Sequence, residues 1–166
     1  VHRDIAARNV LLDGSGKAKL ADLGLSRLLQ DKQGEQTTAS YVGPVRWMAP
    51  EAIQSRKYSS ASDAYSFGVL MCEVWSDGAV PYANVHSVAD VAVAVLQSGA
   101  RPSIAPATPS GQAALMRQLF SADPSNRPSM EDARRILQSN ANDDPSRDAE
   151  NDGDGDHGEY VGASDL

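Results

Sequence analysis

The sequence predicts a mainly α-helical protein, a helical bundle around one buried central helix, with a short β-hairpin near its start. Three observations lead to this fold class. Residues 62–78 are apolar on nearly every side, as in a helix that other elements enclose. Three later segments repeat apolar residues at helical spacing, and two short segments near the start of the chain flank a strong turn signal.

The hairpin is the first element. Residues 10–12 form a short apolar run, residues 13–16 read Asp-Gly-Ser-Gly, and residues 17–21 alternate polar with apolar side chains. Because such a hairpin folds the chain back on itself, we expect it to return Asp22 close to Asn9.

Polar residues at the two ends of this hairpin suit the transfer of a phosphoryl group. Asp4 supplies a carboxylate that could orient a hydroxyl and accept its proton. Asn9 and Asp22 supply oxygen atoms of the kind that Mg²⁺ prefers. One cysteine and three scattered histidines do not favour a transition-metal site. The alternative interpretation is that the three residues are ordinary turn and cap residues.

A long loop is expected over residues 25–48, which are polar and show no sustained period. Loops of this length inside a compact domain are usually functional. Its hydroxyl-bearing side chains include Thr37, Thr38, Ser40 and Tyr41.

The central helix is expected over residues 62–78. Ser62 suits its N-cap, Gly78 suits its stop, and Pro81 follows shortly after. Asp63 in the first turn would favour the helix dipole, and Cys72 would be a small core residue. The apolar residues of this helix are Tyr65, Phe67, Val69, Leu70, Met71, Cys72, Val74 and Trp75.

Three shorter amphipathic helices follow. Ser87 with Asp90 suits the start of the first and Gly99 its end, while Ser129 with Asp132 suits the start of the last. Their apolar stripes predict core positions and no catalytic role. The stripes are Val88, Val91, Ala92, Val95 and Leu96; Leu115, Met116, Leu119 and Phe120; and Met130, Ala133, Ile136 and Leu137.

The order of three motifs resembles the signature of the eukaryotic protein kinase family. The motifs are His2-Arg3-Asp4 with Asn9 five residues after the aspartate, Asp22-Leu23-Gly24, and Ala49-Pro50-Glu51. The resemblance covers residues 1–138, which would form the C-terminal lobe of a kinase domain. The Gly-rich phosphate loop, the strand lysine and its glutamate partner have no counterpart in this sequence. The 166 residues alone are therefore expected to be inactive.

This resemblance implies a chemical role for five residues. Asp4 would accept the proton of the acceptor hydroxyl, and Arg8 would steer the acceptor side chain and the base. Asn9 and Asp22 would hold the Mg²⁺ that accompanies ATP. Leu11 would lie under the adenine.

The resemblance also makes the loop over residues 25–48 the activation segment. Arg3 would receive the phosphate of a modified hydroxyl residue, because guanidinium binds phosphate through paired hydrogen bonds. Tyr41 is the first candidate for that residue, although it could equally be a packed aromatic. Thr37, Thr38 and Ser40 remain open.

A structural frame is implied as well. His2 belongs to the catalytic loop, and Asp63 would accept hydrogen bonds from the backbone of that loop. Arg127 would form a buried ion pair with Glu51, the last residue of the Ala-Pro-Glu motif.

The motif details are closest to tyrosine kinases or tyrosine-kinase-like kinases. Serine/threonine kinases usually carry a lysine two residues after the catalytic aspartate, where this chain has Ala6, and residues 44–51 resemble the tyrosine-kinase substrate platform. Leu23 departs from the usual Asp-Phe-Gly motif, and Leu119-Phe120 replaces a common Cys-Trp pair. The alternatives are a serine/threonine kinase of tyrosine-kinase-like type and a non-catalytic pseudokinase or scaffold module.

Residues 139–166 are predicted to form an acidic, disordered tail. Residues 140–166 carry nine acidic residues against Arg147, a net charge of −8, whereas the rest of the chain has thirteen acids and fourteen bases. So polar a segment cannot bury enough surface to fold. A solvating tail is the plain interpretation. Tyr160 could also dock an SH2-type partner, and Leu166 a PDZ-type partner.

Together these features predict a protein kinase that uses ATP and Mg²⁺ on a protein substrate. We expect it in the cytoplasm or on the cytoplasmic side of a membrane receptor. No apolar run approaches the ~20 residues of a membrane span. The nearly neutral folded part offers no basic patch for nucleic acid.

Overall fold

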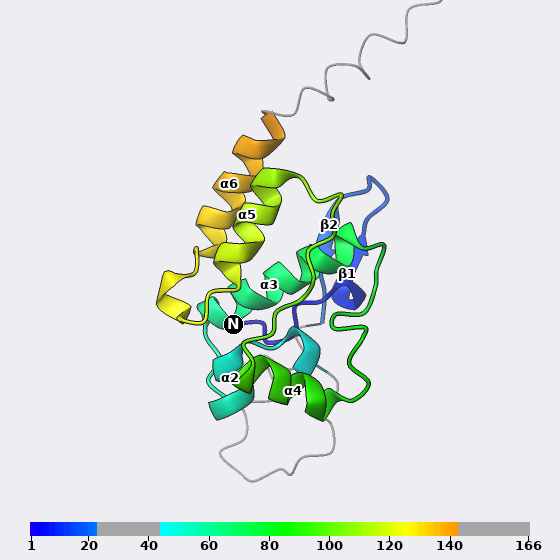
Figure 1. The fold of residues 1–166 in the computed structure, drawn as a ribbon. Helices are drawn as coiled ribbons and strands as arrows, with labels where there is room; N and C mark the ends of the chain where they lie inside the picture. Colours follow the sequence, from blue (N-terminus) through cyan, green and yellow to red (C-terminus); the bar gives the residue numbers. More distant parts are fainter. Residues whose placement is uncertain (23–43, 143–166) are drawn as a thin grey trace, which may run out of the picture.

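Helix α3 (Ser60–Trp75) forms the centre of the structure (Figure 1). The computed structural model describes residues 1–22 and 44–142. Around α3 lie α2 (Pro50–Ser55), α4 (Val88–Gln97), α5 (Ser110–Leu119) and α6 (Met130–Asn142). The described residues also form a β-hairpin of β1 (Val10–Leu12) and β2 (Ala18–Leu20). Three short 3-10 helices complete the described elements: η1 (Ala7–Asn9), η2 (Val45–Trp47) and η3 (Pro124–Asn126). The predicted fold class is confirmed.

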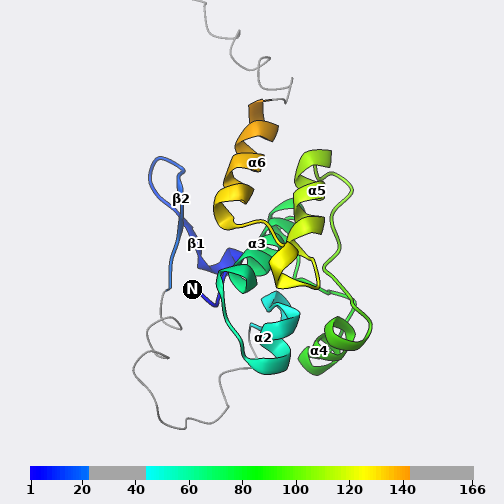
Figure 2. The ribbon, with the colours of Figure 1, turned by 90° about the vertical axis from the view of Figure 1, so that its left-hand side faces the viewer.

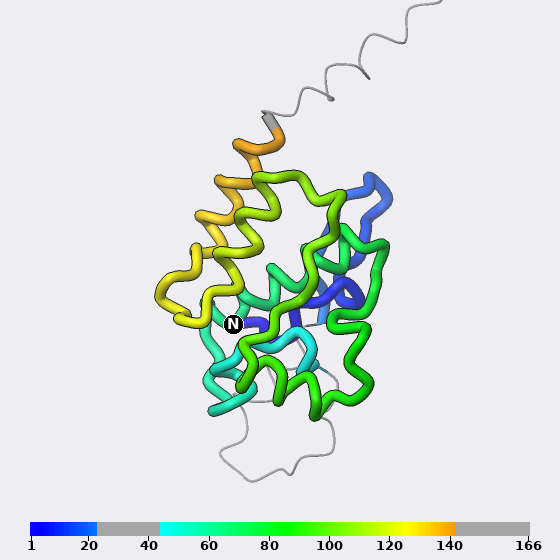
Figure 3. The backbone as a smooth tube through the Cα atoms, viewed as in Figure 1, coloured from blue at the N-terminus to red at the C-terminus, as the bar shows by residue number. Residues whose placement is uncertain are grey.

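The helices form two groups at opposite sides of α3. Helices α5 and α6 pack side by side, and α2 packs against α4 at the other side, as two perpendicular views show (Figures 1 and 2). Figure 3 traces the chain through the turn that joins α5 to α6, which run antiparallel. The start of the chain lies near the start of α3. No helix in the described ranges is long and apolar enough to cross a membrane.

The hairpin has the expected turn chemistry. Its strands pair antiparallel, with Val10 opposite Leu20. The Asp13 carboxylate accepts the backbone N–H groups of Ser15 and Lys17, both at 3.0 Å, and pairs with Lys19. Hydrogen bonds from Ser15 and Lys19 lower the pKa of Asp13 to about 2. The turn is therefore held by a carboxylate that stays ionised well below neutral pH.

Helix α3 begins earlier than the sequence suggested. Its N-cap is Ser59, not Ser62, and the two serines form a capping box. The Ser59 hydroxyl accepts the N–H of Ser62 at 3.2 Å, and the Ser62 hydroxyl accepts the N–H of Ser59 at 2.9 Å. Several serines lie near this helix start, and the sequence alone does not show which of them is the N-cap. The extended backbone conformation of Ser59 identifies it as the N-cap.

The far end and one face of α3 also differ from expectation. The helix ends at Trp75, and the positive φ angles of Asp77 (54°) and Gly78 (77°) turn the chain away. Val74, one of the apolar residues that the sequence predicts to be enclosed, is 66% exposed. The Cys72 thiol is buried as predicted, and burial raises its pKa to about 11.

The three amphipathic helices are present. The Ser87 hydroxyl accepts the N–H of Asp90 at 3.0 Å, and the Ser129 hydroxyl accepts that of Asp132 at 3.1 Å, so both predicted N-caps are confirmed. Helix α6 continues to Asn142, so residues 139–142 of the predicted tail are helical. Extending a formed helix costs far less than starting one, so polar residues can continue it past the last apolar position. Residues 143–166 lie outside the described residues.

Helix α2 was not expected from the sequence. It starts at Pro50 and ends before Arg56, whose φ of 54° is left-handed. Proline at the first helical position is a known start signal, but the segment is only six residues long and lacks a side-chain cap at Ala49.

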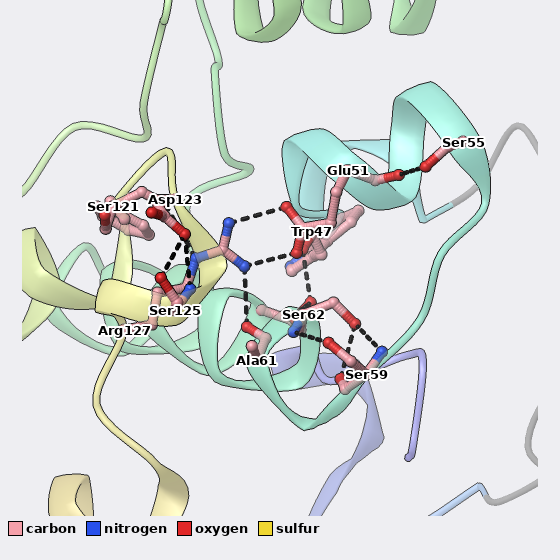
Figure 4. A network of polar contacts seen from close by, with 12 residues as sticks. Trp47, Glu51, Ser55, Ser59, Ala61, Ser62, Ser121, Asp123, Ser125 and Arg127 are labelled. Carbon is pink, nitrogen blue, oxygen red and sulfur yellow. Dashed lines mark hydrogen bonds and ion pairs between the residues drawn. The ribbon is translucent and has the colours of Figure 1, made fainter.

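An ion pair between Arg127 and Glu51 joins three parts of the fold (Figure 4). The two guanidinium Nη atoms donate to the two carboxylate oxygens at 2.7 and 2.8 Å. Arg127 also donates to the carbonyl of Ala61 on α3 and, through Nε, to that of Ser121, both at 2.9 Å. Its side chain is 0% exposed and that of Glu51 20%. The pair expected from the sequence is present, and it ties α2 to α3 and to the α5–α6 connection.

Replacing Arg127 with methionine should lower the free energy of unfolding by about 3–5 kcal/mol, because Glu51 would lose the partner of a buried charge. Urea denaturation of the protein measures this change. Arg135→Met is the matched control, since Arg135 pairs with Asp132 on the exposed face of α6 and should cost less than about 1 kcal/mol. Equal losses for the two variants would contradict this account.

Candidate active site

The loop over residues 2–9 is attached to the first turn of α3. The backbone N–H groups of His2 and Arg3 donate to the two carboxylate oxygens of Asp63, at 2.6 and 2.9 Å. Asp63 is buried, and Arg3 adopts a positive φ of 74°. The hydrogen bonds that the sequence led us to expect are present. They fix a loop with little regular secondary structure of its own.

A second carboxylate, Glu73, holds the other end of the same loop. Its Oε2 accepts the N–H of Ala7 and the indole N–H of Trp47, both at 2.9 Å. Sequence analysis missed this residue. The available signal was an acidic residue inside an otherwise apolar helix, since buried acids are rare unless they are paired.

Asp4, Arg8 and Asn9 are in direct contact. The Asn9 amide nitrogen donates to the backbone carbonyl of Asp4 at 2.7 Å and to its carboxylate at 2.9 Å. The Arg8 guanidinium pairs with the same carboxylate. His2 accepts the Asp4 N–H through Nδ1 at 3.3 Å. Because the Asn9 nitrogen donates in this way, Oδ1 is the side-chain atom that could bind a cation.

Asp22 follows directly after the point where the hairpin returns to this group. The Ala21 N–H donates to the Asn9 carbonyl at 2.7 Å, and Asp22 is exposed with a φ of 63°. Among the described residues, no cluster of three or more His, Cys, Asp or Glu could hold a metal ion. An amide oxygen and one carboxylate nevertheless suit Mg²⁺, which usually keeps several waters and binds substrate phosphates.

A platform formed by residues 44–47 lies against this loop. The Arg8 guanidinium lies 4.4 Å from the centroid of the Trp47 ring, within cation–π range. Trp47 is the last residue of the short helix η2 (Val45–Trp47), and its carbonyl accepts a hydrogen bond from the Ser66 hydroxyl at 2.7 Å.

Arg46 anchors the platform to a second segment. It donates to three backbone carbonyls of the α3–α4 connection, those of Pro81, Tyr82 and Val85. The platform is therefore fixed to α3 and to the segment after it.

The remaining predicted site residues are less enclosed. Leu11 in β1 is 59% exposed. The Arg3 guanidinium lies 5.3 Å from the centroid of the Tyr58 ring, and its Nε has no hydrogen-bond partner among the described residues. The predicted phosphorylation candidates, Thr37, Thr38, Ser40 and Tyr41, lie outside the described residues. Leu23 also lies outside them.

Comparison with known proteins identifies the family. A sequence model described as "Protein tyrosine and serine/threonine kinase" matches residues 1–137. The chain belongs to this kinase family. Ephrin type-A receptor 8 of Rattus norvegicus is 41% identical over 139 residues, which are 83% of this chain and 37% of that protein. Ephrin type-B receptor 4 of Homo sapiens is 43% identical over 131 residues, 77% of this chain and 13% of that protein. The kinase chain described here thus spans well under half the length of these relatives.

Replacing Asp63 with alanine should loosen the kinase loop over residues 2–9, because two backbone N–H groups lose a charged acceptor. A hydrogen bond to a charged group contributes about 1.5–3 kcal/mol, so amide hydrogen exchange in this loop should become at least about tenfold faster. Asp132→Ala, which removes the partner of the Ser129 cap on α6, should leave exchange in the loop unchanged. Unchanged exchange in Asp63→Ala would refute the anchoring role.

Proposed function

We propose that residues 1–138 form the C-terminal part of a protein kinase domain that transfers the γ-phosphoryl group of ATP to a protein hydroxyl, in the first place that of tyrosine. The observation that carries this proposal is the contact of Asp4 with Arg8 and Asn9, on a loop that Asp63 and Glu73 hold to α3. The family match over residues 1–137 supports it.

In this proposal Asp4 orients the acceptor hydroxyl and accepts its proton. Asn9 and Arg8 keep the carboxylate in place, because each contacts one of its oxygens. Asn9 Oδ1 and the Asp22 carboxylate would hold Mg²⁺, and Leu11 would contact the adenine. When bound, ATP would supply the phosphoryl group, and Mg²⁺ would supply positive charge that offsets the negative charge of the phosphate oxygens.

Regulation would act through Arg3. Its guanidinium lies over the Tyr58 ring, and its Nε has no hydrogen-bond partner in residues 1–22 and 44–142. A phosphate on Tyr41, or on one of the neighbouring hydroxyl residues, would give this guanidinium a charged partner. Such a pair would connect the activation segment to the loop that carries Asp4. Residues 143–166 would form a tail, with Tyr160 and Leu166 as sites for SH2- or PDZ-type partners. We place the domain on the cytoplasmic side of a membrane or in the cytoplasm.

Tyrosine is favoured as acceptor by the residue two positions after Asp4. Ala6 is small and completely buried, so no lysine side chain reaches toward the phosphate from this position. Trp47 with Arg8 above it forms the adjoining surface. A serine/threonine kinase of tyrosine-kinase-like type is the second candidate, since Leu23 and Leu119-Phe120 depart from the tyrosine-kinase pattern.

Asp4→Asn in the complete kinase domain should lower phosphoryl transfer to a tyrosine peptide by about 10²–10⁴-fold, the usual contribution of a general base. Nucleotide affinity should stay nearly unchanged, because Asp4 does not hold ATP. Transfer is measured with labelled ATP, and nucleotide affinity by calorimetry. The 166-residue chain alone is expected to give no transfer.

Asp90→Asn on the exposed side of α4 is the control and should retain full activity. Loss of nucleotide binding in Asp4→Asn would assign Asp4 a different role. A serine version of the same peptide decides the acceptor class: transfer to it at a similar rate would favour the second candidate. Absence of transfer to either peptide in the wild-type domain would favour a non-catalytic scaffold.

A further inference from the structure

Glu73 is a buried carboxylate that the proposed chemistry does not use. It is 6% exposed, and the ion pairs of the described residues do not include it. A buried carboxylate without a cation is costly unless hydrogen bonds compensate for its lost hydration. The groups that donate hydrogen bonds to Glu73 therefore indicate which parts of the protein its negative charge holds in place.

Among the described residues, the two hydrogen bonds to the Glu73 side chain come from the candidate active site. A single oxygen, Oε2, accepts the backbone N–H of Ala7 and the indole N–H of Trp47, each at 2.9 Å. Ala7 lies in the loop that carries Asp4, and Trp47 lies in the platform. One oxygen thus sets the distance between these two segments, which lie forty residues apart in sequence.

The charge of Glu73 also reaches Arg8 through Trp47. A carboxylate that accepts the indole N–H pushes electron density into the ring, and a richer ring attracts a cation more strongly. The cation on this ring is the Arg8 guanidinium, at 4.4 Å from the ring centroid. The Arg8 side chain is 43% exposed, so without this contact it would sample many rotamers.

Arg8 in turn pairs with the carboxylate of Asp4. We propose that Glu73 is a positioning residue that orients Asp4 through Trp47 and Arg8. This inference rests on the proposed phosphoryl transfer. In this proposal Glu73 acts on the position of Asp4, and its contacts are with Ala7 and Trp47.

The other tryptophan provides a matched control. The Trp75 indole N–H donates to Gln112 Oε1 at 2.8 Å, between α3 and α5. Its acceptor is neutral, and none of the arginine–aromatic contacts found among the described residues involves Trp75. Removing the Trp75–Gln112 hydrogen bond measures the effect of losing an indole hydrogen bond that has no proposed connection to Asp4.

The test is a double-mutant cycle in the complete kinase domain. Glu73→Gln keeps the side-chain size and an oxygen that can accept both N–H groups, so it removes mainly the charge. We expect kcat to fall about tenfold with an ATP KM within about twofold, because small misplacements of a catalytic group are costly. In an Arg8→Ala background the same substitution should change kcat less than about twofold. Gln112→Ala should leave kcat unchanged.

An independent readout is the indole ¹H–¹⁵N resonance. In Glu73→Gln the Trp47 signal should move upfield, because its hydrogen bond loses a charged acceptor, while the Trp75 signal stays in place. Gln112→Ala should move only the Trp75 signal.

Two results would overturn the inference: wild-type kcat in Glu73→Gln, or an equal fall of kcat with and without Arg8. Should Glu73→Gln fail to fold, Trp47→Phe replaces it in the same cycle, since Trp47 is only half-buried, and the same outcomes decide. Full activity in Asp4→Asn would refute the proposed function itself. An inactive Asp4→Asn combined with a wild-type Glu73→Gln would refute the positioning role alone.

Discussion

Two buried carboxylates on one helix determine the shape of the candidate active site. Asp63 and Glu73 stand ten residues apart on α3, about 15 Å along the helix axis at 1.5 Å per residue. They accept backbone N–H groups from the two parts of the loop over residues 2–9. The donors belong to the main chain and the acceptors are buried carboxylates, so these bonds break only if the Asp63 or Glu73 side chain turns or the loop backbone moves. A rigid buried helix thereby imposes its geometry on a segment with little regular structure of its own.

The rest of the site depends on contacts of the same long-range kind. Glu51 and Arg127 are separated by 76 residues and hold α2, which begins three residues after the end of the platform. Arg46 joins the platform to the α3–α4 connection, and Trp47 meets both Arg8 and Glu73. The loop over residues 2–9, the platform and the ion pair are therefore parts of one framework around α3. A change in any one of them should therefore shift the position of the Asp4 side chain.

Features with local causes could be predicted from the sequence. The turn at Asp13 and the caps at Ser87 and Ser129 depend on residues within four positions of one another. Spaced motifs identified the Asp63 and Arg127 contacts only through resemblance to a family. The local sequence pattern did not distinguish Ser59 from Ser62 as the N-cap of α3 and did not predict α2. It also predicted that Val74 is buried, which is wrong. Glu73 was missed because its donors, Ala7 and Trp47, are distant in sequence, and no local pattern indicates that a charge in an apolar helix has found partners.

The central claim of the proposal is that Asn9, on the loop fixed to α3, and Asp22, after the hairpin, hold the metal ion of one bound nucleotide. Paramagnetic broadening by Mn²⁺ tests it most directly, with the complete kinase domain, a non-hydrolysable ATP analogue and Mn²⁺ in place of Mg²⁺. The Asn9 side-chain amide and the backbone N–H groups of Ala21 and Asp22 should broaden strongly, while signals from α6 stay sharp. Sharp Asn9 and Asp22 signals with nucleotide bound, or broadening centred elsewhere, would contradict the account.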